Sequence, residues 1–452
     1  MSGLPASSEG ASQLRRALGL GDLILYGLIV IQPTAPMPVY GIMSVRSNGH
    51  AVTTVLLAMV AMLFTALSYG KMARAYPSAG SAFTYVGREI HPILGYITGW
   101  AMAMDYMLNP LICTILCSKF AMNFMPNIPY FLWVFAFALL FTVLNLHGIK
   151  TSAKINTILA AAMSVVILIF LAAAARYIGL IPHDGFLFFS RPFYNPQTFS
   201  ARSVLGGTSL AVLTYIGFDG ISTLSEEARN PRRNILLATV IVCLITGVLA
   251  SVEVYAAQLV WPASQPFPDI DTAFVYIAGR AGGLWLFTLI NITLLVATIG
   301  SGTAAQLGAA RLLYGMGRGN AIPRSFFGAI DPKHRIPRNN VLFVGVIALI
   351  GALMMSFERG VELLNFGALL AFMGVNASAF VHYYLREERK TILNFITPLA
   401  GFLVCFLLWF SLGWHAKLLG IVWIAIGIAY GAYNTRGFQR ELISFDVPLI
   451  DT

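Results

Sequence analysis

Two aspartates, Asp105 and Asp219, lie inside runs of apolar residues that are long enough to cross a membrane. A carboxylate near the centre of a bilayer costs about 2.5 to 3.5 kcal/mol on insertion scales, so such an acid is by default a functional residue. Where water is excluded, a carboxylate can alternate between binding a cation and binding a proton. These residues therefore indicate cation binding, proton exchange or both.

Asp219 belongs to the segment Gly217-Phe218-Asp219-Gly220, which interrupts an otherwise apolar run. Two glycines loosen a helix, so we expect a helix break with the carboxylate inside it. The role predicted for Asp219 is a proton gate linked to substrate binding. The alternative is that Asp219 caps the helix after the break by accepting N–H bonds. Both roles can hold together.

Asp105 lies in the middle of another apolar run, between Met104 and Tyr106, with no Gly or Pro beside it. A buried acid needs a partner, and no basic residue is predicted at the same depth. The partner is then a substrate ammonium or a proton. The alternative is a protonated Asp105 that bonds to a neighbouring helix. Together, Asp105 and Asp219 would suit a diamine, with one acid for each ammonium.

The composition identifies an integral membrane protein. Of the 452 residues, 58% are hydrophobic and only 11% are charged, which no soluble domain of this length is expected to show. The net charge is +10, but the basic residues are scattered between apolar runs, so nucleic-acid binding is not expected. At roughly 20 residues per crossing we predict twelve transmembrane helices. Their ranges are 21–45, 51–75, 95–124, 129–147, 156–178, 204–228, 235–259, 285–315, 340–357, 362–385, 393–412 and 415–434.

A second helix break is predicted in the first span, at Gln32-Pro33-Thr34-Ala35-Pro36. Paired breaks in two halves of a hydrophobic chain indicate a transporter built from inverted repeats, with its site between the breaks. The division that follows is a tail 1–19, a first repeat of five helices 20–180, a second repeat of five helices 200–388, two further helices within 391–435, and a tail 436–452.

The distribution of positive charge predicts that both termini are cytoplasmic. This orientation places all but eight of the 29 Lys and Arg residues inside, in agreement with the positive-inside rule. The eight outside are Arg46, Lys119, Arg176, Arg191, Arg202, Arg280, Arg359 and Lys417.

Aromatic and acidic residues near the breaks complete the candidate site. Tyr40, Trp100, Tyr106, Tyr215 and Phe218 could surround an ammonium by cation–π contact, although core packing is the alternative for each. Tyr106 and Phe218 are the preferred residues for this contact, because Tyr106 adjoins Asp105 and Phe218 lies in the second break. The predicted substrate-binding residues are Gln32, Thr34, Tyr40, Asp105, Tyr106, Tyr215, Gly217, Phe218 and Asp219.

Glu226 and Glu227 follow the second break, close to three arginines, Arg229, Arg232 and Arg233. Ion pairs that form and break there could close a cytoplasmic gate. Asp219, Glu226 and Glu227 are therefore the predicted residues for proton coupling or gating. A solvated helix end is the alternative.

Several motifs resemble the amino acid-polyamine-organocation (APC) transporter superfamily. They are Leu213-Thr-Tyr-Ile-Gly-Phe-Asp219, Leu224-Ser-Glu-Glu-Ala-Arg-Asn-Pro231 and Tyr76-Pro-Ser-Ala-Gly-Ser81. Leu67-Ser-Tyr-Gly-Lys71, Met104-Asp-Tyr106, Arg311-Leu-Leu-Tyr-Gly-Met-Gly-Arg318 and Leu364-Asn-Phe-Gly-Ala-Leu369 are most similar to its bacterial putrescine importers. The resemblance implies a five-plus-five inverted repeat of the LeuT type with helices one and six broken. It also implies a substrate between helices one, three, six, eight and ten, and proton-coupled import or exchange.

Two positions depart from the superfamily pattern. Many of its amino acid carriers have a Gly-Ser-Gly type of first break that holds the substrate carboxylate, whereas Gln32 to Pro36 stand here and proline has no N–H to donate. A lysine that some proton-coupled relatives carry in helix five is replaced by Met163, so coupling through that lysine is not expected.

The function predicted from these features is a secondary transporter of the inner (plasma) membrane that imports a polyamine such as putrescine by proton-coupled alternating access. The alternative is an amino acid permease or an amino acid/amine exchanger of the same superfamily. The partners are then the organic cation or amino acid, a proton and the lipid bilayer. Ser301 and Thr303 in helix eight could complete a sodium site, which is a minor alternative.

Enzyme and channel functions are not expected. The four cysteines and seven histidines show no metal-ligand spacing, so we predict no metal, no cofactor and no enzymatic activity. The two breaks form one pair rather than repeated pore loops, which argues against a channel.

Overall fold

The computed structural model describes residues 17–77, 81–147, 153–225, 227–318, 322–331, 336–387 and 390–437. Helices make up the fold, and the only strand-like pairing in these ranges is an isolated bridge between Leu18 and Ala228. The elements in chain order are α1 (Leu20–Ile31), α2 (Pro36–Arg46), α3 (Ala51–Ala75), α4 (Ser81–Glu89), α5 (Pro92–Met122), α6 (Tyr130–Leu146), α7 (Ala153–Leu180), α8 (Phe186–Ser190), α9 (Ala201–Ala211), the 3₁₀ segments η1 (Val212–Thr214) and η2 (Phe218–Leu224), α10 (Pro231–Val260), α11 (Ala273–Gly282), α12 (Leu284–Arg318), α13 (Arg324–Phe327), α14 (Arg338–Met354), α15 (Phe357–Phe380), the π-helical η3 (Val381–Arg386), α16 (Ile392–Phe410) and α17 (Trp414–Asn434).

Each of the twelve predicted ranges contains helix. Within the described residues, nine helices are long and apolar enough to cross a membrane, and the bent pair α1 and α2 makes a tenth. The helices α6 and α14 are apolar but have only 17 residues each. The structure is therefore that of a multi-pass, all-helical membrane protein, while twelve crossings and the inverted repeat stay predictions.

Both predicted interruptions are present. The axes of α1 and α2 meet at 56°, with Gln32 at the corner in a left-handed backbone conformation (φ 68°). In the sixth predicted span, α-helix ends at Ala211 and the chain continues through η1 and η2. Gly217, between the two 3₁₀ segments, has φ +124°. The chain thus departs from α-helical geometry at both places that the Gly and Pro residues indicated.

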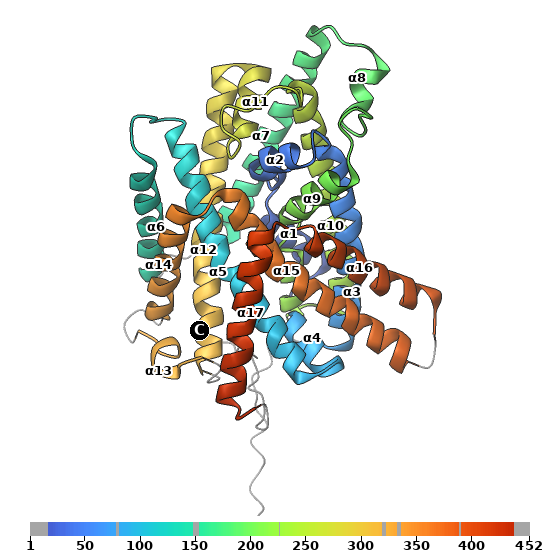
Figure 1. Cartoon of the computed structure of the whole chain (residues 1–452), viewed down its shortest axis with the longest axis vertical. Coiled ribbons are helices and arrows are strands. Elements are labelled where there is room, and N and C mark those ends of the chain that lie inside the picture. The colour runs from blue at the N-terminus through green and yellow to red at the C-terminus, as the bar shows by residue number, and fades with distance from the viewer. Residues whose placement is uncertain are drawn as a thin grey trace, which may run out of the picture.

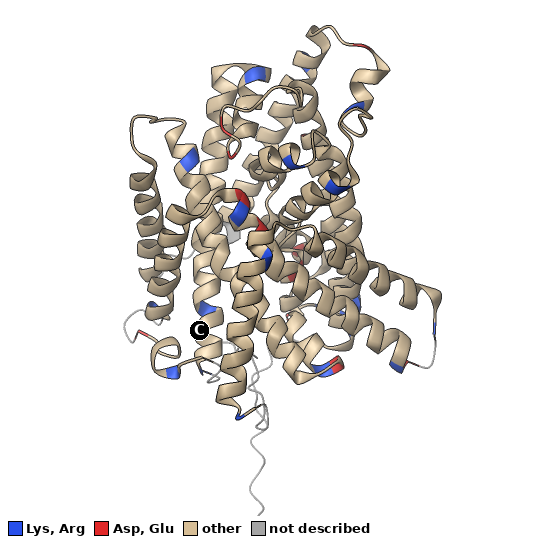
Figure 2. Cartoon of the chain, viewed as in Figure 1, with Lys and Arg blue, Asp and Glu red and all other residues tan. Residues whose placement is uncertain are grey.

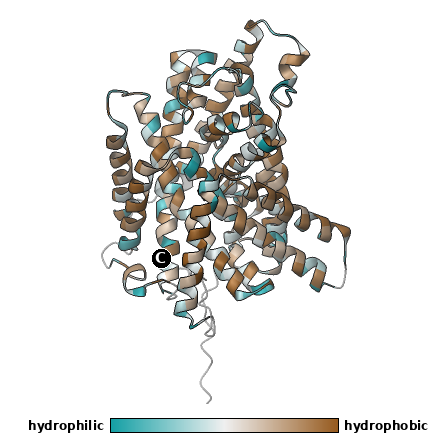
Figure 3. Ribbon diagram, in the orientation of Figure 1, coloured by the Kyte–Doolittle hydropathy of each residue, from teal (hydrophilic) through white to brown (hydrophobic). Residues whose placement is uncertain are grey.

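The helices pack as a bundle in which α15 lies against α5 and α16, α10 lies along α3 and α1, and α12 lies along α5 (Figure 1). Most Lys and Arg residues occur at helix ends or in connections, with long uncharged stretches between them (Figure 2). Apolar residues cover the outer helices (Figure 3), and large side chains such as Phe131, Phe135, Leu403 and Phe410 are exposed. Lipid chains are the surroundings that these outer faces require.

Two shorter helices connect the long ones. The amphipathic helix after Tyr76 is α4, which packs against α5 and α15. The proline-rich connection after Trp261 ends in α11, which packs against α2, α7 and α12. The two helices lie at opposite ends of the bundle (Figure 1).

A fully buried carboxylate, that of Glu89 at the end of α4, joins three elements. It accepts hydrogen bonds from the Tyr76 hydroxyl and from Arg386 Nη1 (2.9 Å), and it contacts His382 Nδ1 (2.7 Å). Arg386 Nη2 also donates to the Glu89 carbonyl oxygen at 2.9 Å. Glu89 therefore ties α4 to the end of α3 and to η3.

We predict that Glu89→Gln lowers the melting temperature of the purified chain. The substitution removes a charge-assisted bond to Arg386, a loss of about 1.5 to 3 kcal/mol, and turns an acceptor into a donor. Glu387→Gln is the matched control, because it makes the same change at an exposed neighbour. Equal melting temperatures for the two variants would show that the Glu89 cluster does not stabilise the fold.

Candidate functional site

A cavity of about 410 Å³ lies where the two helix breaks meet. Its walls come from α1, α5, α7, η2 with the residues just before it, and α12. These elements correspond to predicted spans one, three, five, six and eight. The volume lies in the range of small-molecule sites.

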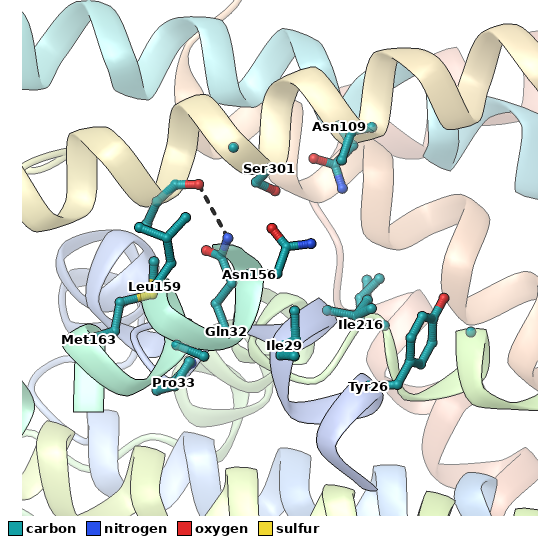
Figure 4. Close-up of a pocket in the computed structure, with 18 of the residues that line it drawn as sticks. Tyr26, Ile29, Gln32, Pro33, Asn109, Asn156, Leu159, Met163, Ile216 and Ser301 are labelled. Carbon is teal, nitrogen blue, oxygen red and sulfur yellow. Dashed lines mark hydrogen bonds between the residues drawn. The ribbon is translucent and has the colours of Figure 1, made fainter. Parts of the chain in front are cut away.

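The first break contributes Gln32 and Pro33 to the cavity wall. Gln32 Nε2 donates a hydrogen bond to the Ala297 carbonyl oxygen in α12, at 3.2 Å (Figure 4). This bond fixes the orientation of the amide and uses one of its two N–H donors, so the amide oxygen and one N–H remain. The amide oxygen can accept a hydrogen bond from a ligand that donates one.

The second break contributes Gly217, Asp219 and Gly220. The N–H of Gly217 donates to Asp219 Oδ1 at 3.2 Å, so the carboxylate is tied back to the residue at the corner of the break. Asp219 therefore bonds to the backbone at the corner of the break. Its predicted roles as proton gate and as helix cap both stay predictions.

The helix α5 brings Asp105 and Tyr106 to the cavity, and Asn109 follows one turn later. Asp105 and Asp219 thus line one enclosed space from different elements. Among the described residues, no Lys, Arg or His lines this cavity. Two carboxylates without a protein cation make the site suited to a positively charged ligand or to protons.

Four predicted binding residues do not line the cavity. Tyr40 packs edge-on against Phe267 and Phe274, and the Tyr215 hydroxyl donates to the Val55 carbonyl oxygen at 2.8 Å. Phe218 is buried against Tyr69 and Phe372, and the Thr34 hydroxyl faces Met163 Sδ at 3.9 Å. Each of the four is buried in contacts with neighbouring elements and does not line the cavity. The cation–π contact preferred for Phe218 has no support in this arrangement.

Trp100 is also placed in packing. Its ring stacks on Trp423, and each indole N–H donates to the backbone carbonyl oxygen of the other residue at 2.9 Å. The alternative of core packing is the one that the structure shows for Trp100.

Only part of the segment predicted to form the ion-pair gate after η2 belongs to the residues that the structure describes. Glu226 lies outside the described residues. In the described part of this segment, no ion pair joins Glu227 to Arg229, Arg232 or Arg233. The backbone makes the contact instead, since Leu18 N donates to Glu227 O at 3.1 Å and Arg229 N donates to Leu18 O at 2.7 Å.

Tyr26, Asn109 and Asn156 are site residues that the sequence analysis missed. The side chains of Asn109, Asn156, Gln32 and Ser301 point toward a common space, while Tyr26 lies at one end (Figure 4). Asn109 could have been found from its spacing, because a residue four positions after Asp105 shares its helix face. No comparable signal marks Asn156, which lies early in α7.

Of the two hydroxyl residues considered for a sodium site in α12, Ser301 lines the cavity and Thr303 does not. The Thr303 hydroxyl donates to the Ile299 carbonyl oxygen of its own helix at 2.8 Å and keeps its oxygen lone pairs. The sodium site stays a minor alternative. Within the described residues no group of three or more His, Cys, Asp and Glu side chains could hold a metal ion.

The cavity is closed on the side of α2 and α11. Tyr40, Phe170, Phe267 and Phe274 form an aromatic cluster there, with ring centroids 4.8 to 6.1 Å apart in contacting pairs. In the same loop Asp269 pairs with Lys119 of α5 at 3.0 Å. The cavity is lined by α1 and η2, not by α2 and α11. The residues just before α1 and just after η2 meet at the bridge between Leu18 and Ala228.

Comparison with known proteins identifies what this architecture is similar to. A family model for amino acid permeases matches residues 40–441. The low-affinity putrescine importer PlaP of Escherichia coli is 35% identical over 443 residues, which cover 96% of this chain and 97% of that protein. The branched-chain amino acid permease BcaP of Bacillus subtilis is 27% identical over 96% of both chains. A vacuolar cationic amino acid transporter of Arabidopsis thaliana is 26% identical over 84% of this chain and 65% of its own length.

We predict that Gly217→Ala lowers the melting temperature, whereas Gly220→Ala does not. At φ +124° an L side chain is strained, and a Cβ on Gly217 would lie 3.0 Å from Val30 Cγ1 and 3.2 Å from Ile31 Cγ1. Such strain costs about 1 to 3 kcal/mol. A Cβ on Gly220 would have Tyr26 Oη as its nearest neighbour, at 3.9 Å. Indistinguishable melting curves for the two variants in the same detergent would contradict this account of the break.

Proposed function

This chain belongs to the amino acid permease family, and from that premise we propose that it imports a small organic cation, a polyamine such as putrescine, by alternating access coupled to protons. The observation that carries the proposal is the pair of carboxylates, Asp105 and Asp219, in a cavity that no basic side chain of the described residues lines. Two ammonium groups would balance two carboxylates. The putrescine importer PlaP, at 35% identity, supports the same substrate class.

The backbone of the breaks supports a cation over an anion. A substrate carboxylate needs free N–H donors at a helix end. Pro33 and Pro36 have none, and the Gly217 N–H is already bonded to Asp219. Gln32 presents its amide oxygen and one remaining N–H, because the other N–H is bonded to Ala297. The backbone of the breaks thus offers few N–H donors to a substrate carboxylate.

The shape of the site supports an arrangement that is open on one side. The aromatic cluster around Tyr40 closes the side of α2, whereas α1 and η2 line the cavity on the other side. The bias of Lys and Arg residues supports a cytoplasmic location for the N-terminal end of α1. We therefore propose an inward-facing state of a multi-pass inner-membrane protein with both termini in the cytoplasm.

An amino acid permease is the second candidate, supported by the identity to BcaP and by three neutral polar residues in the cavity. Asn109, Asn156 and Ser301 each carry a donor that could bind a carboxylate. Uptake into proteoliposomes of putrescine, spermidine, arginine and leucine, each labelled, separates the candidates. Saturable leucine or arginine uptake that putrescine does not inhibit would overturn the polyamine proposal.

We predict that Asp105→Asn raises the KM for putrescine by about 10- to 100-fold. The substitution keeps the size of the side chain and removes one charge-assisted bond to an ammonium, which contributes about 1.5 to 3 kcal/mol. Asp184→Asn, at an exposed residue remote from the cavity, is the control. An unchanged KM in initial-rate uptake by Asp105→Asn would exclude the two-carboxylate arrangement.

We predict that Asp219→Asn abolishes uptake driven by a pH gradient but retains exchange of labelled for unlabelled putrescine at saturating putrescine, with a raised KM because one of the two ammonium partners is lost. Exchange needs binding and access alone, whereas accumulation also needs a group that takes up and releases the proton. The comparison variant is Glu253→Gln in α10, because the Glu253 carboxylate is fully buried and has no hydrogen-bond partner among the described residues. Loss of pH-driven uptake in Glu253→Gln, with normal uptake in Asp219→Asn, would assign the proton to Glu253 instead.

A further inference from the structure

A second cavity, of about 420 Å³, lies between the end of α3 and the start of α10. It is lined by three arginines, Arg74, Arg232 and Arg233, and by two leucines, Leu236 and Leu237. It shares no lining residue with the cavity between the helix breaks. The transport proposal therefore gives it no role.

The three arginines are exposed, and none of them forms an ion pair within the described part of the chain. Three guanidinium groups around one cavity repel each other, so an anion that binds among them relieves this repulsion.

The packing of α3 against α10 brings the arginines together. Gly70, one turn before Arg74, lies so near α10 that a Cβ on it would meet Leu236 Cα at 2.6 Å. This close approach places the last turn of α3 beside the first turns of α10. The arginine positions are thus set by the helix contact, not by freely moving loops.

The leucines distinguish this cavity from a site for a soluble anion. Leu236 and Leu237 are partly exposed and continue the cavity wall along α10 from the arginines, into a helix that is apolar enough to cross the membrane. A ligand that matches both parts has a phosphate group for the guanidinium forks and a hydrocarbon chain for the leucines. Basic pockets between transmembrane helices bind lipid head groups in this way.

We propose that this cavity binds the head group of an anionic phospholipid, with its phosphate among Arg74, Arg232 and Arg233 and the start of an acyl chain along Leu236 and Leu237. The site is at the end of the bundle where α1 begins, because Leu18 bonds to Glu227 and Arg229, just before α10. A lipid bound there contacts the start of α10. The second helix break and η2 come directly before α10 in the chain.

The test measures lipid binding to the purified full-length chain by native mass spectrometry, with phosphatidylglycerol and phosphatidylcholine as probes. We expect phosphatidylglycerol to bind at least about tenfold more tightly, since each arginine near a membrane surface contributes about fivefold. The variant Arg74→Gln/Arg232→Gln/Arg233→Gln should lose this preference. The matched control Arg324→Gln/Arg338→Gln/Arg436→Gln, at exposed arginines outside the cavity, should keep it.

Three outcomes would overturn the proposal. The first is an unchanged preference in the cavity variant, and the second is an equal loss in the control, which would indicate net charge alone. The third is displacement of the lipid by millimolar inorganic phosphate, which would assign the cavity to a soluble anion. If the triple variant does not fold, the three single Arg→Gln variants, each checked by its melting temperature, replace it and should each weaken binding several-fold.

Glu226 supplies one further control. It lies outside the described residues, and its carboxylate is close to the arginines in sequence. Phosphatidylglycerol affinity that does not change in Glu226→Gln supports a cavity that is open to lipid. A rise of tenfold or more would mean that this carboxylate occupies the arginines, which also would overturn the proposal.

Discussion

The need to satisfy backbone hydrogen bonds in the interior of a membrane constrains the whole site. A helix can be interrupted there only where protein or a water-filled cavity takes over the freed N–H and C=O groups. In the first break, two of the five residues are prolines, so fewer N–H groups need partners. In the second break, 3₁₀ bonds such as Tyr215 N to Val212 O and Gly220 N to Gly217 O replace α-helical ones. Both breaks can therefore face the same cavity without leaving many donors unpaired.

The same constraint limits the hydrogen-bond donors that face the cavity. Prolines and 3₁₀ turns leave few backbone N–H groups free at the breaks. Asp219 accepts the Gly217 N–H, and one of the two Gln32 amide N–H groups is bonded to Ala297. Asp105 adds a second carboxylate from α5. A positively charged ligand meets these groups as partners, whereas an anion would meet few donors other than the neutral polar residues.

The sequence was sufficient to predict the class of the fold, both helix breaks and the two acids of the cavity. These features depend on single residues whose cost in a membrane is large, namely Gly217, Asp219, Asp105 and the prolines of the first break. The direction of each side chain could not be predicted in the same way. Tyr40 in α2 and Phe218 in η2 lie near the breaks in sequence, but both side chains turn into aromatic packing that only the tertiary contacts of their helices define.

Asn156 shows the complementary limit. It has no charge, proline or glycine to mark it, and only the tertiary approach of α7 to α1 and α12 brings it to the cavity.

The contacts that hold the two sides of the site differ in kind, and this difference follows from the packing of the helices. On the side of α2, aromatic rings and the Lys119–Asp269 pair fill the space. On the other side the start of α1 is held by backbone bonds between Leu18 and the segment before α10, and the rest of α1 packs against α10 and η2. The two sides of the site are thus held by different kinds of contact, aromatic rings and an ion pair on one side, a backbone bridge and helix packing on the other.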